Sequence, residues 1–212
     1  MSEALSSCHV DPDGVSPNQR ITSALGEIYY INSTSENIAF SQSGRDFSAD
    51  DYPAVAQQFM SGWINSSGHR ANILRASTTH IGVGLHRSGN RIYATKKFMG
   101  YVVARDQDTL PSEISIEDPV LSYQLNRALE VSQDDVVVRV SLPDPGARWT
   151  SSDGRIYTGF MFAQPEWRDA SSFSIVLPVE FGPGTYRVQF GTQGGNRTST
   201  EAFSYTVTER DS

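Results

Sequence analysis

The side chains best suited to bind a metal ion are four histidines and one cysteine: His9, His69, His80, His86 and Cys8. His69 lies where a helical pattern that includes Trp63 gives way to a strand pattern that begins at Ile81. A residue at such a junction can be held rigidly over a cleft, although its imidazole could instead only cap the helix end. We expect the two histidines of the strand to be surface residues and the thiol to be a cysteine without a role.

A nucleophilic active site is not indicated. Ser66 and Ser67 are sequence neighbours of His69, but no strand–turn–helix pattern surrounds them as the nucleophile elbow of a hydrolase would require. Asp11 and Asp13 resemble a fragment of a calcium loop, but the other ligand positions of such a loop are missing. We therefore predict a simple turn there.

Two helices are predicted before the strand pattern. Ser16 can cap a helix, Pro17 fits its first position and Gln19 completes a capping box, so this helix should end near Leu25. Residues 27–50 are rich in Ser, Asn and Asp and are expected to be mostly loop. The second helix has apolar residues at three- and four-residue spacing, namely Tyr52, Val55, Ala56, Phe59, Met60 and Trp63.

A β-hairpin is predicted after the second helix. Ile81, Val83 and Leu85 alternate with small or polar residues, which is the period of a strand with one buried face. Ser88-Gly89-Asn90 supplies a tight turn, and residues 92–96 form the return strand. The helix end and the hairpin together should position His69.

Three segments of the first half resemble the CAP superfamily, which comprises cysteine-rich secretory proteins, antigen 5 and pathogenesis-related proteins. They are His9-Val10-Asp11-Pro12-Asp13-Gly14 with Gln19-Arg20-Ile21, Glu36-Asn37-Ile38-Ala39, and Trp63 to Phe98 with its Gly68-His69-Arg70-Ala71-Asn72-Ile73-Leu74 run. Their order and spacing are most similar to the cysteine-poor prokaryotic branch. The resemblance covers residues 8–104 and implies an α-β-α sandwich domain.

The resemblance also implies a cleft in which two histidines and two acidic residues can bind a divalent metal ion, often zinc. The matching residues here are His9, His69 and Glu36, while Ser66 stands where the second acid is usual. The implied zinc site is weak, because tight sites have three or four protein ligands. His9 and His69 should face each other across the cleft, with Glu36 orienting a metal-bound water. The residues expected to line this cleft are Asn37, Arg70 and Ser66.

The N-terminus departs from the family pattern. Members usually have a long first helix before the first histidine, whereas residues 1–8 leave no room for one and are expected to be disordered. A missing helix would leave apolar surface of the sheet open, so we expect weakened packing or self-association there. It would also leave His9 in a mobile tail. Independently of this, the alternative role for Glu36 is to bond backbone amides of its own loop.

Composition and charge limit the partners. Hydrophobic residues make up 38% of the 212 residues, which is enough for a packed core. The net charge of −7 argues against nucleic acid as a main partner. A single cysteine excludes an intrachain disulfide, and no segment is long and apolar enough to span a bilayer. No signal peptide is visible in this chain, although the resemblance implies an extracellular or cell-surface location.

The second half of the chain has a different pattern. Polar residues and Pro111 mark 105–113 as a linker. Short alternating runs then recur between Gly- and Pro-bearing turns, which predicts an all-β, immunoglobulin-like sandwich over 114–209. The expected fold is therefore α+β, with a truncated CAP-like domain at 9–104 followed by this sandwich. Residues 111–212 hold 14 acidic and 8 basic residues, so this part carries most of the negative charge.

Two functions follow from these patterns. The first is a secreted binding module for a lipid, glycan, cell-surface or protein ligand, with a weak divalent-metal cleft. The alternative is a zinc-dependent hydrolase in which His9 and His69 hold the ion and Glu36 acts as the base. The incomplete set of four cleft residues favours the binding module.

Overall fold

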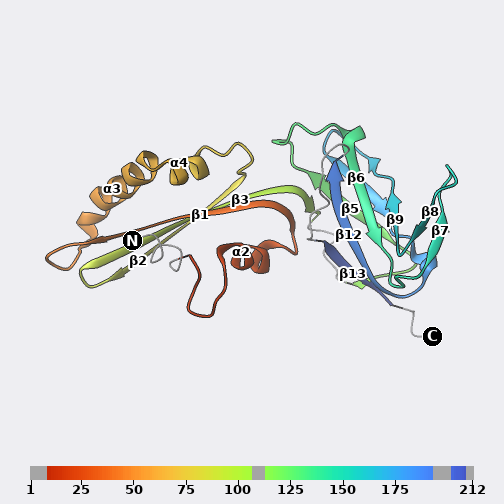
Figure 1. The fold of residues 1–212 in the computed structure, drawn as a ribbon, viewed down its shortest axis with the longest axis horizontal. Helices are drawn as coiled ribbons and strands as arrows, with labels where there is room; N and C mark the ends of the chain where they lie inside the picture. The colour runs from red at the N-terminus through yellow and green to blue at the C-terminus, as the bar shows by residue number, and fades with distance from the viewer. Residues whose placement is uncertain (1–8, 107–112, 193–201, 209–212) are drawn as a thin grey trace. The chain divides into compact units, whose positions relative to one another are not determined.

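A computed structural model describes residues 9–106, 113–192 and 202–208 (Figure 1). The chain divides into two compact units, Met1–Ala24 with Asn32–Tyr101 and Leu25–Ile31 with Val102–Ser212. Two long strands, β1 (Tyr29–Gln42) and β3 (Arg91–Arg105), contribute residues to both units. Among the described residues, no helix is long and apolar enough to cross a membrane.

The first unit is a sheet with helices on both faces. β3 lies between β1 and β2 (His80–Ser88). Figure 1 shows α2 on one face of these strands and α3 with α4 on the other. The helical segments are α2 (Pro17–Leu25), the 3-10 turn η1 (Ala49–Asp51), α3 (Tyr52–Asn65) and α4 (Ser67–Ile73). This confirms the expected α-β-α arrangement.

Local sequence signals account for the two longer helices. The hydroxyl of Ser16 accepts a hydrogen bond from the backbone N–H of Gln19, whose amide oxygen accepts one from the Ser16 N–H at 2.8 Å, so the predicted capping box is confirmed. On α3, the buried residues recur at the predicted four-residue spacing. They pack with two residues of β3 in one cluster, which contains Val55, Phe59, Trp63, Phe47, Ile92 and Ala94.

The predicted loop at 27–50 is wrong, because most of it is the strand β1. Several of its polar residues form tertiary contacts that the sequence does not show. Thr34 donates to the side chain of Asn18, and Glu36 and Asn37 bond to residues of β3 and α4. Strand propensity is easily overridden by such contacts.

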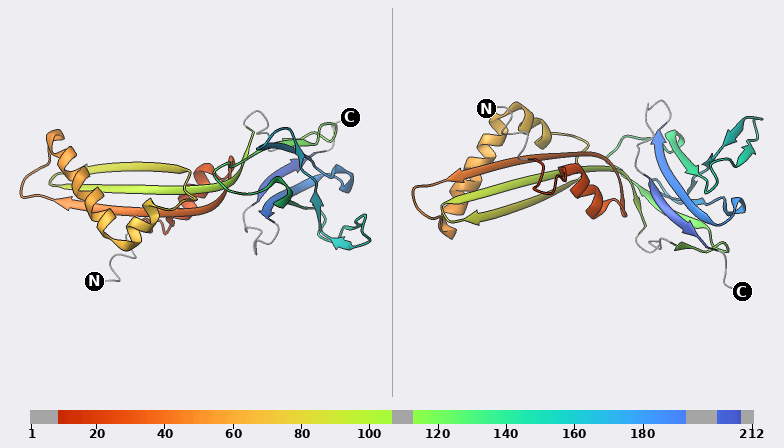
Figure 2. Two further views of the ribbon diagram at one scale, coloured as in Figure 1. Left: turned by 90° about the horizontal axis from the view of Figure 1, so that it is seen from above. Right: turned by 60° about the horizontal axis from the view of Figure 1, so that its bottom comes forward.

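The predicted burial of one face of β2 is also wrong. Ile81, Val83 and Leu85 are 56%, 67% and 62% exposed. They pair with Phe98, Lys96 and Ala94 of β3 and so share the face on which α3 lies. In the left panel of Figure 2, α3 crosses these strands near the hairpin turn and most of β2 remains uncovered. α3 lies near Val83 and Leu85 but leaves both side chains exposed.

The second unit is a β-sandwich. One sheet contains the end of β3 with β5 (Val120–Leu125), β11 (Ser172–Val176) and β10 (Glu166–Trp167). The other contains β4 (Glu113–Ile114), β13 (Phe203–Val207), β12 (Gly184–Thr192), β6 (Val136–Ser141) and β9 (Phe160–Ala163). Two further strands form a hairpin, β7 (Arg148–Thr150) with β8 (Ile156–Thr158), and the short 3-10 turns are η3 (Gln133–Asp135) and η4 (Val179–Phe181).

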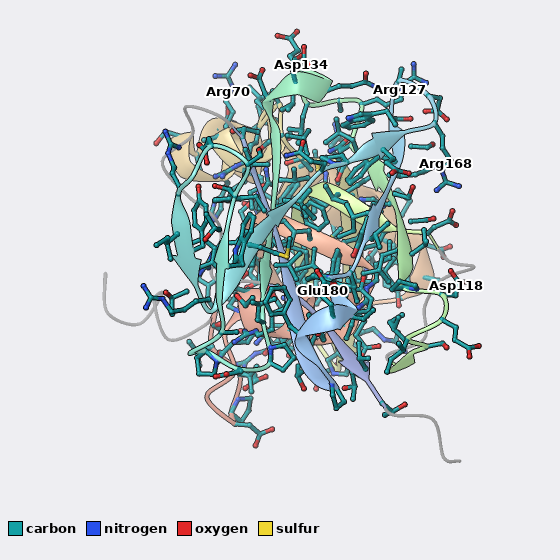
Figure 3. All side chains as sticks on the ribbon, turned by 90° about the vertical axis from the view of Figure 1, so that its right-hand side faces the viewer. Arg70, Asp118, Arg127, Asp134, Arg168 and Glu180 are labelled. Carbon is teal, nitrogen blue, oxygen red and sulfur yellow. The ribbon has the colours of Figure 1, made fainter. Side chains whose placement is uncertain are left out.

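This strand order is typical of immunoglobulin-like sandwiches, in which strands A, B, E and D form one sheet and strands C, F and G the other. With the end of β3 as strand A, the first sheet has the order A-B-E-D, and β6, β12 and β13 correspond to C, F and G. β4 runs parallel to β13, and all other pairs of the second sheet are antiparallel. The hydroxyl of Tyr186 donates to the carbonyl oxygen of Gly182 at 2.7 Å, which is the bond of a tyrosine corner. Figure 3 shows charged residues such as Asp118, Asp134 and Arg168 pointing away from the sandwich.

The predicted linker at 105–113 needs correction at both ends. Arg105 is the last residue of β3 and only 7% exposed, and Glu113 begins β4. The polar composition was misleading because Arg105 is buried against aromatic rings, which a sequence pattern does not reveal. Residues 107–112, and the N-terminal residues 1–8, lie outside the described part of the chain.

Candidate functional site

Glu36 lies in the middle of β1, and its carboxylate is almost fully buried, with 5% of the side chain exposed. Its Oε2 atom lies 2.9 Å from Nδ1 of His9. Its Oε1 atom accepts hydrogen bonds from Nζ of Lys97 at 2.7 Å and from Oγ1 of Thr95 at 3.1 Å, with Nη2 of Arg20 at 3.5 Å. The structure therefore brings His9 and Glu36 together, and it surrounds the carboxylate with cationic groups.

The pKa of Glu36 lies below its ordinary value. Burial by itself raises this pKa, but the hydrogen bonds from Lys97 and His9, the charge of Lys97 and the Thr95 hydroxyl together outweigh burial. Glu36 is therefore a stable anion at neutral pH. An efficient general base would need a pKa nearer the working pH.

The backbone of His9 is fixed by the turn that precedes α2. Nη2 of Arg20 donates to the carbonyl oxygen of His9 at 3.2 Å, and Nη1 of Arg20 lies 3.3 Å from Oδ2 of Asp11. Oδ1 of Asp11 accepts the backbone N–H groups of Asp13 and Val15 at 3.1 and 2.8 Å. The turn predicted at Asp11 and Asp13 is confirmed, and Arg20 links it to Glu36.

Asn37 points to the opposite face of β1 from Glu36, since successive strand residues alternate. Its side chain is 0% exposed, and its Nδ2 donates to the carbonyl oxygen of His69 at 3.0 Å. Its Oδ1 accepts from Nδ2 of Asn72 at 2.8 Å. Asn37 was expected to line the cleft, but it is instead a buried brace between β1 and α4.

The Glu-Asn-Ile segment is thus tied to the Gly-His-Arg helix by one buried amide. A comparison with protein families agrees: residues 6–104 match the family described as "CAP: Cysteine-rich secretory protein family". This part of the chain belongs to the CAP superfamily. The match ends at residue 104, and no curated protein matches the chain.

The remaining residues expected in the cleft of the CAP domain lie around α4. Ser66 separates α3 from α4, and its carbonyl oxygen accepts the backbone N–H of Arg70 at 2.8 Å. The Arg70 side chain is exposed and points outward (Figure 3). The imidazole of His69 is half-buried and has no hydrogen bond or ion pair with the described residues. Only the backbone of His69 is fixed, through Asn37.

The residues present do not fit a zinc ion. In the described ranges, no three His, Cys, Asp or Glu side chains lie close enough together to hold a metal. The carboxylate of Glu36 already contacts Lys97 and Arg20, whose charges oppose a divalent cation. A zinc ion bridging His9 and His69 therefore stays a prediction without support from this geometry.

A second feature lies on the same face as Glu36, and the sequence did not predict it. We call it the shelf, a depression of about 590 Å³ on β1, β3 and β2 lined by Ile38, Ala39, Phe40, Gly84, Leu85, His86, Tyr93, Ala94 and Thr95. The ring of Tyr93 lies 6.4 Å from that of Phe40 and 6.5 Å from that of His86. Phe40 is 66% exposed and Tyr93 41%. Three aromatic rings therefore form one end of an open, mostly apolar surface.

The shelf leads towards the Glu36 carboxylate. Along β1, Glu36, Ile38 and Phe40 alternate onto one face, and across the hairpin Gly84 pairs with Thr95 and His86 with Tyr93. Phe40 is about 13 Å from Glu36 along the strand, at roughly 3.3 Å per residue. The alternation of Glu36, Ile38 and Phe40 could have indicated that these residues share one face of a strand. It was not recognised because this segment was predicted to be a loop.

Proposed function

We propose that the CAP domain is a binding module outside the cell or at its surface, and that the shelf binds a lipid-like amphiphile. The observation that carries this proposal is a row of exposed rings, Phe40, Tyr93 and His86, on a flat sheet face. A volume of about 590 Å³ falls within the range of small-molecule sites, which are typically apolar with a few polar groups. The polar group here is the cluster around Glu36.

Of the expected ligand classes, the lining supports lipid over glycan. Glycan sites need many hydrogen-bond donors and acceptors, whereas the side chains lining the shelf contain few besides Thr95, His86 and the Tyr93 hydroxyl. In this arrangement the apolar part of the ligand lies over the rings, and its polar end lies near Lys97. Burying apolar surface supplies the affinity, and the charged cluster supplies orientation.

The zinc-dependent hydrolase has less support. Its base, Glu36, has a lowered pKa and is bonded to Lys97, Thr95 and His9. The two histidines are held on different faces of β1. Arg20 bonds both the backbone carbonyl of His9 and the side chain of Glu36, whereas Asn37 bonds the backbone carbonyl of His69. A carboxylate with a lowered pKa and several hydrogen-bond partners is a weak proton acceptor, so this site favours binding over catalysis.

The test uses the full chain with a fluorescent sterol and a fluorescent fatty acid as probes. Phe40→Ser and Tyr93→Ser should each weaken binding by about 10- to 100-fold, because each removes roughly 1.5–3 kcal/mol of apolar burial. Ile156→Ser in the sandwich, where the native residue is 61% exposed, is the matched control and should change nothing. Glu36→Gln should leave binding within about threefold of the native value.

Two results would overturn the proposal. One is probe binding that survives both Phe40→Ser and Tyr93→Ser. The other is hydrolysis of ester, peptide or glycan substrates that is lost in Glu36→Gln, because that outcome requires Glu36 to act on a substrate. Each experiment should be accompanied by circular dichroism to show that the variants fold.

A further inference from the structure

We infer that strand β2 pairs with the β2 strand of a second copy of this chain, which makes an isologous dimer through the open edge of the CAP-domain sheet. β2 bonds to β3 along one side over all nine of its residues. Among the described residues, no strand pairs with its other side. An edge strand presents unpaired N–H and C=O groups and is a ready template for another strand.

This edge lacks the usual protection. Proteins commonly guard an exposed edge with charged residues, proline or a bulge. Residues 80–86 read His-Ile-Gly-Val-Gly-Leu-His and include neither a Lys, Arg, Asp or Glu nor a proline. The pairing of β2 with β3 also steps by one residue throughout, from His80 with Met99 to Ser88 with Arg91, so it contains no bulge. Because its pairing with β3 is uninterrupted, β2 can accept a partner strand along its whole length.

The sequence of β2 is nearly the same in both directions about Val83. If two copies pair antiparallel with the twofold axis at Val83, His80 faces His86 of the second copy, Ile81 faces Leu85, and Gly82 faces Gly84. An isologous pair needs a surface that is complementary to itself, because each contact occurs twice. In this register the opposed residues match in size and polarity, so β2 is complementary to a second copy of itself. The pattern therefore favours a second copy over an unrelated extended segment.

Gly82 supports a close approach of another backbone. A Cβ atom placed at Gly82 would meet no described atom within 4 Å, and its φ is not positive. Neither space nor backbone conformation within the monomer requires glycine there. Glycine inside a strand weakens it and often marks a site where another backbone comes near.

Apolarity and charge also fit this register. The exposed residues Ile81, Val83 and Leu85 of the two copies would form one continuous apolar stripe on one face of the joined sheet. Arg87, the charged residue within β2, would lie opposite Thr79 of the second copy rather than opposite another arginine. Like charges directly opposite each other destabilise strand pairs, and this register avoids them.

The size of the contact predicts a weak dimer. A standard interface uses about 20–30 residues from each partner and buries about 800 Å² of each. β2 supplies nine residues, and the exposed Tyr52 and Met60 of α3 border the same apolar stripe. This is less than half of a standard contact, so the dimer should form reversibly and only at high protein concentration.

The first experiment measures molecular mass by sedimentation equilibrium over a wide range of concentrations of the full chain. The native chain should show a monomer–dimer equilibrium. Val83→Lys should raise the dimer dissociation constant at least about tenfold, because it removes apolar burial and places two like charges at the axis. Val176→Lys is the matched control, since Val176 is an exposed strand valine (51%) of the sandwich that is not on β2.

The second experiment tests the register by oxidation in a Cys8→Ser background. Val83→Cys should form a disulfide between two copies, because opposed Cα atoms of antiparallel strands lie about 4.5–5.5 Å apart. Ile81→Cys alone should not, because the two copies of residue 81 would be about 13 Å apart along the strand. Mixing the Ile81→Cys and Leu85→Cys chains should restore the cross-link.

A chain that stays monomeric at every concentration, and does not cross-link through Val83→Cys, would overturn the inference. So would a dimer that Val83→Lys leaves intact, or an Ile81→Cys chain that cross-links as readily as Val83→Cys. Larger assemblies without a distinct dimer would also contradict it, because they would show unlimited edge pairing or another surface. The sterol and fatty-acid assays do not depend on this result.

Discussion

Nζ of Lys97 lies 2.7 Å from Oε1 of Glu36, and this contact joins neighbouring strands of the CAP domain. The Lys97 side chain is 26% exposed while that of Glu36 is 5% exposed. On folding, hydrogen bonds with Lys97, Thr95 and His9 therefore replace the hydration of the carboxylate. A buried carboxylate with such partners stabilises the fold as an anion and loses that contribution when it is protonated.

The first prediction concerns acid stability. Because the folded-state pKa of Glu36 lies below its ordinary value of 4.5, its contribution is present above about pH 4.5 and is lost as the pH falls below that value. Glu36→Gln should lower the free energy of unfolding at pH 7 by about 1–3 kcal/mol. The free energy of unfolding of this variant should also fall less steeply than that of the native chain as the pH is lowered below about 4.5. Urea denaturation at several pH values measures both effects.

Glu166→Gln is the control for this prediction, because Glu166 is an exposed carboxylate on β10. That variant should change stability by less than about 0.5 kcal/mol. A Glu36→Gln chain as stable as the native chain at pH 7 would contradict the role given to the Lys97 contact.

The second prediction concerns zinc. Titration of the full chain with Zn²⁺ in a calorimeter should show no saturable site tighter than about 10 µM, because Lys97 and Arg20 surround the Glu36 carboxylate that contacts His9. His9→Ala and His69→Ala should not change the heats. A micromolar site that disappears in both variants would instead show that the two imidazoles bind one ion.

The third prediction concerns Asn37. Replacing it by alanine leaves the carbonyl of His69 and the amide of Asn72 without their buried partner. Asn37→Ala should therefore cost about 2–4 kcal/mol of stability, since two hydrogen bonds are lost in a fully buried site. Thermal or urea unfolding measures the loss. Asn65→Ala, at the exposed end of α3, should cost far less, and equal costs for the two variants would refute the bracing role.

Local signals predicted the helices and the hairpin of the CAP domain. The Ser16–Gln19 capping box and the spacing of the apolar residues on α3 each depend on residues a few positions apart, so sequence alone reveals them. The tyrosine corner is also a local contact, because the hydroxyl of Tyr186 reaches back only four residues to Gly182.

Contacts between distant residues explain what the sequence did not show. β1 is a strand because its polar residues meet partners 16 to 61 positions away, such as Asn18 for Thr34 and Lys97 for Glu36. β2 has the spacing of a half-buried strand, yet α3 leaves its apolar residues Ile81, Val83 and Leu85 exposed (Figure 2). To predict the shelf, one must know that residues 29–42 form a strand and in which register β2 pairs with β3. Composition and motifs give neither, so Phe40 and Tyr93 could not be recognised from the sequence.

The last prediction concerns a buried network in the sandwich. Nε of Arg105 donates to the hydroxyl of Tyr205 at 2.8 Å, and that hydroxyl lies 2.8 Å from the hydroxyl of Tyr123. The guanidinium carbon lies 4.2 Å from the centre of the Tyr205 ring and 4.7 Å from that of Phe203. Burial raises the pKa of Tyr123 well above 10, and the charge and hydrogen bond of Tyr205 raise it further, while the charge of Arg105 opposes this. Tyr123 is therefore neutral in the folded chain.

A group whose pKa is raised on folding contributes stability below its unfolded pKa and loses it as the pH rises above that value. The contribution of Tyr123 to stability should be constant up to about pH 10 and should then fall, because the unfolded chain can ionise Tyr123 and the folded chain cannot. Tyr123→Phe should reduce this alkaline loss, whereas Tyr157→Phe, at a half-buried ring of the β7–β8 hairpin, should leave it unchanged. Urea denaturation between pH 8 and 11, in steps, measures the difference, and an identical alkaline loss in the native and Tyr123→Phe chains would show that other groups cause it.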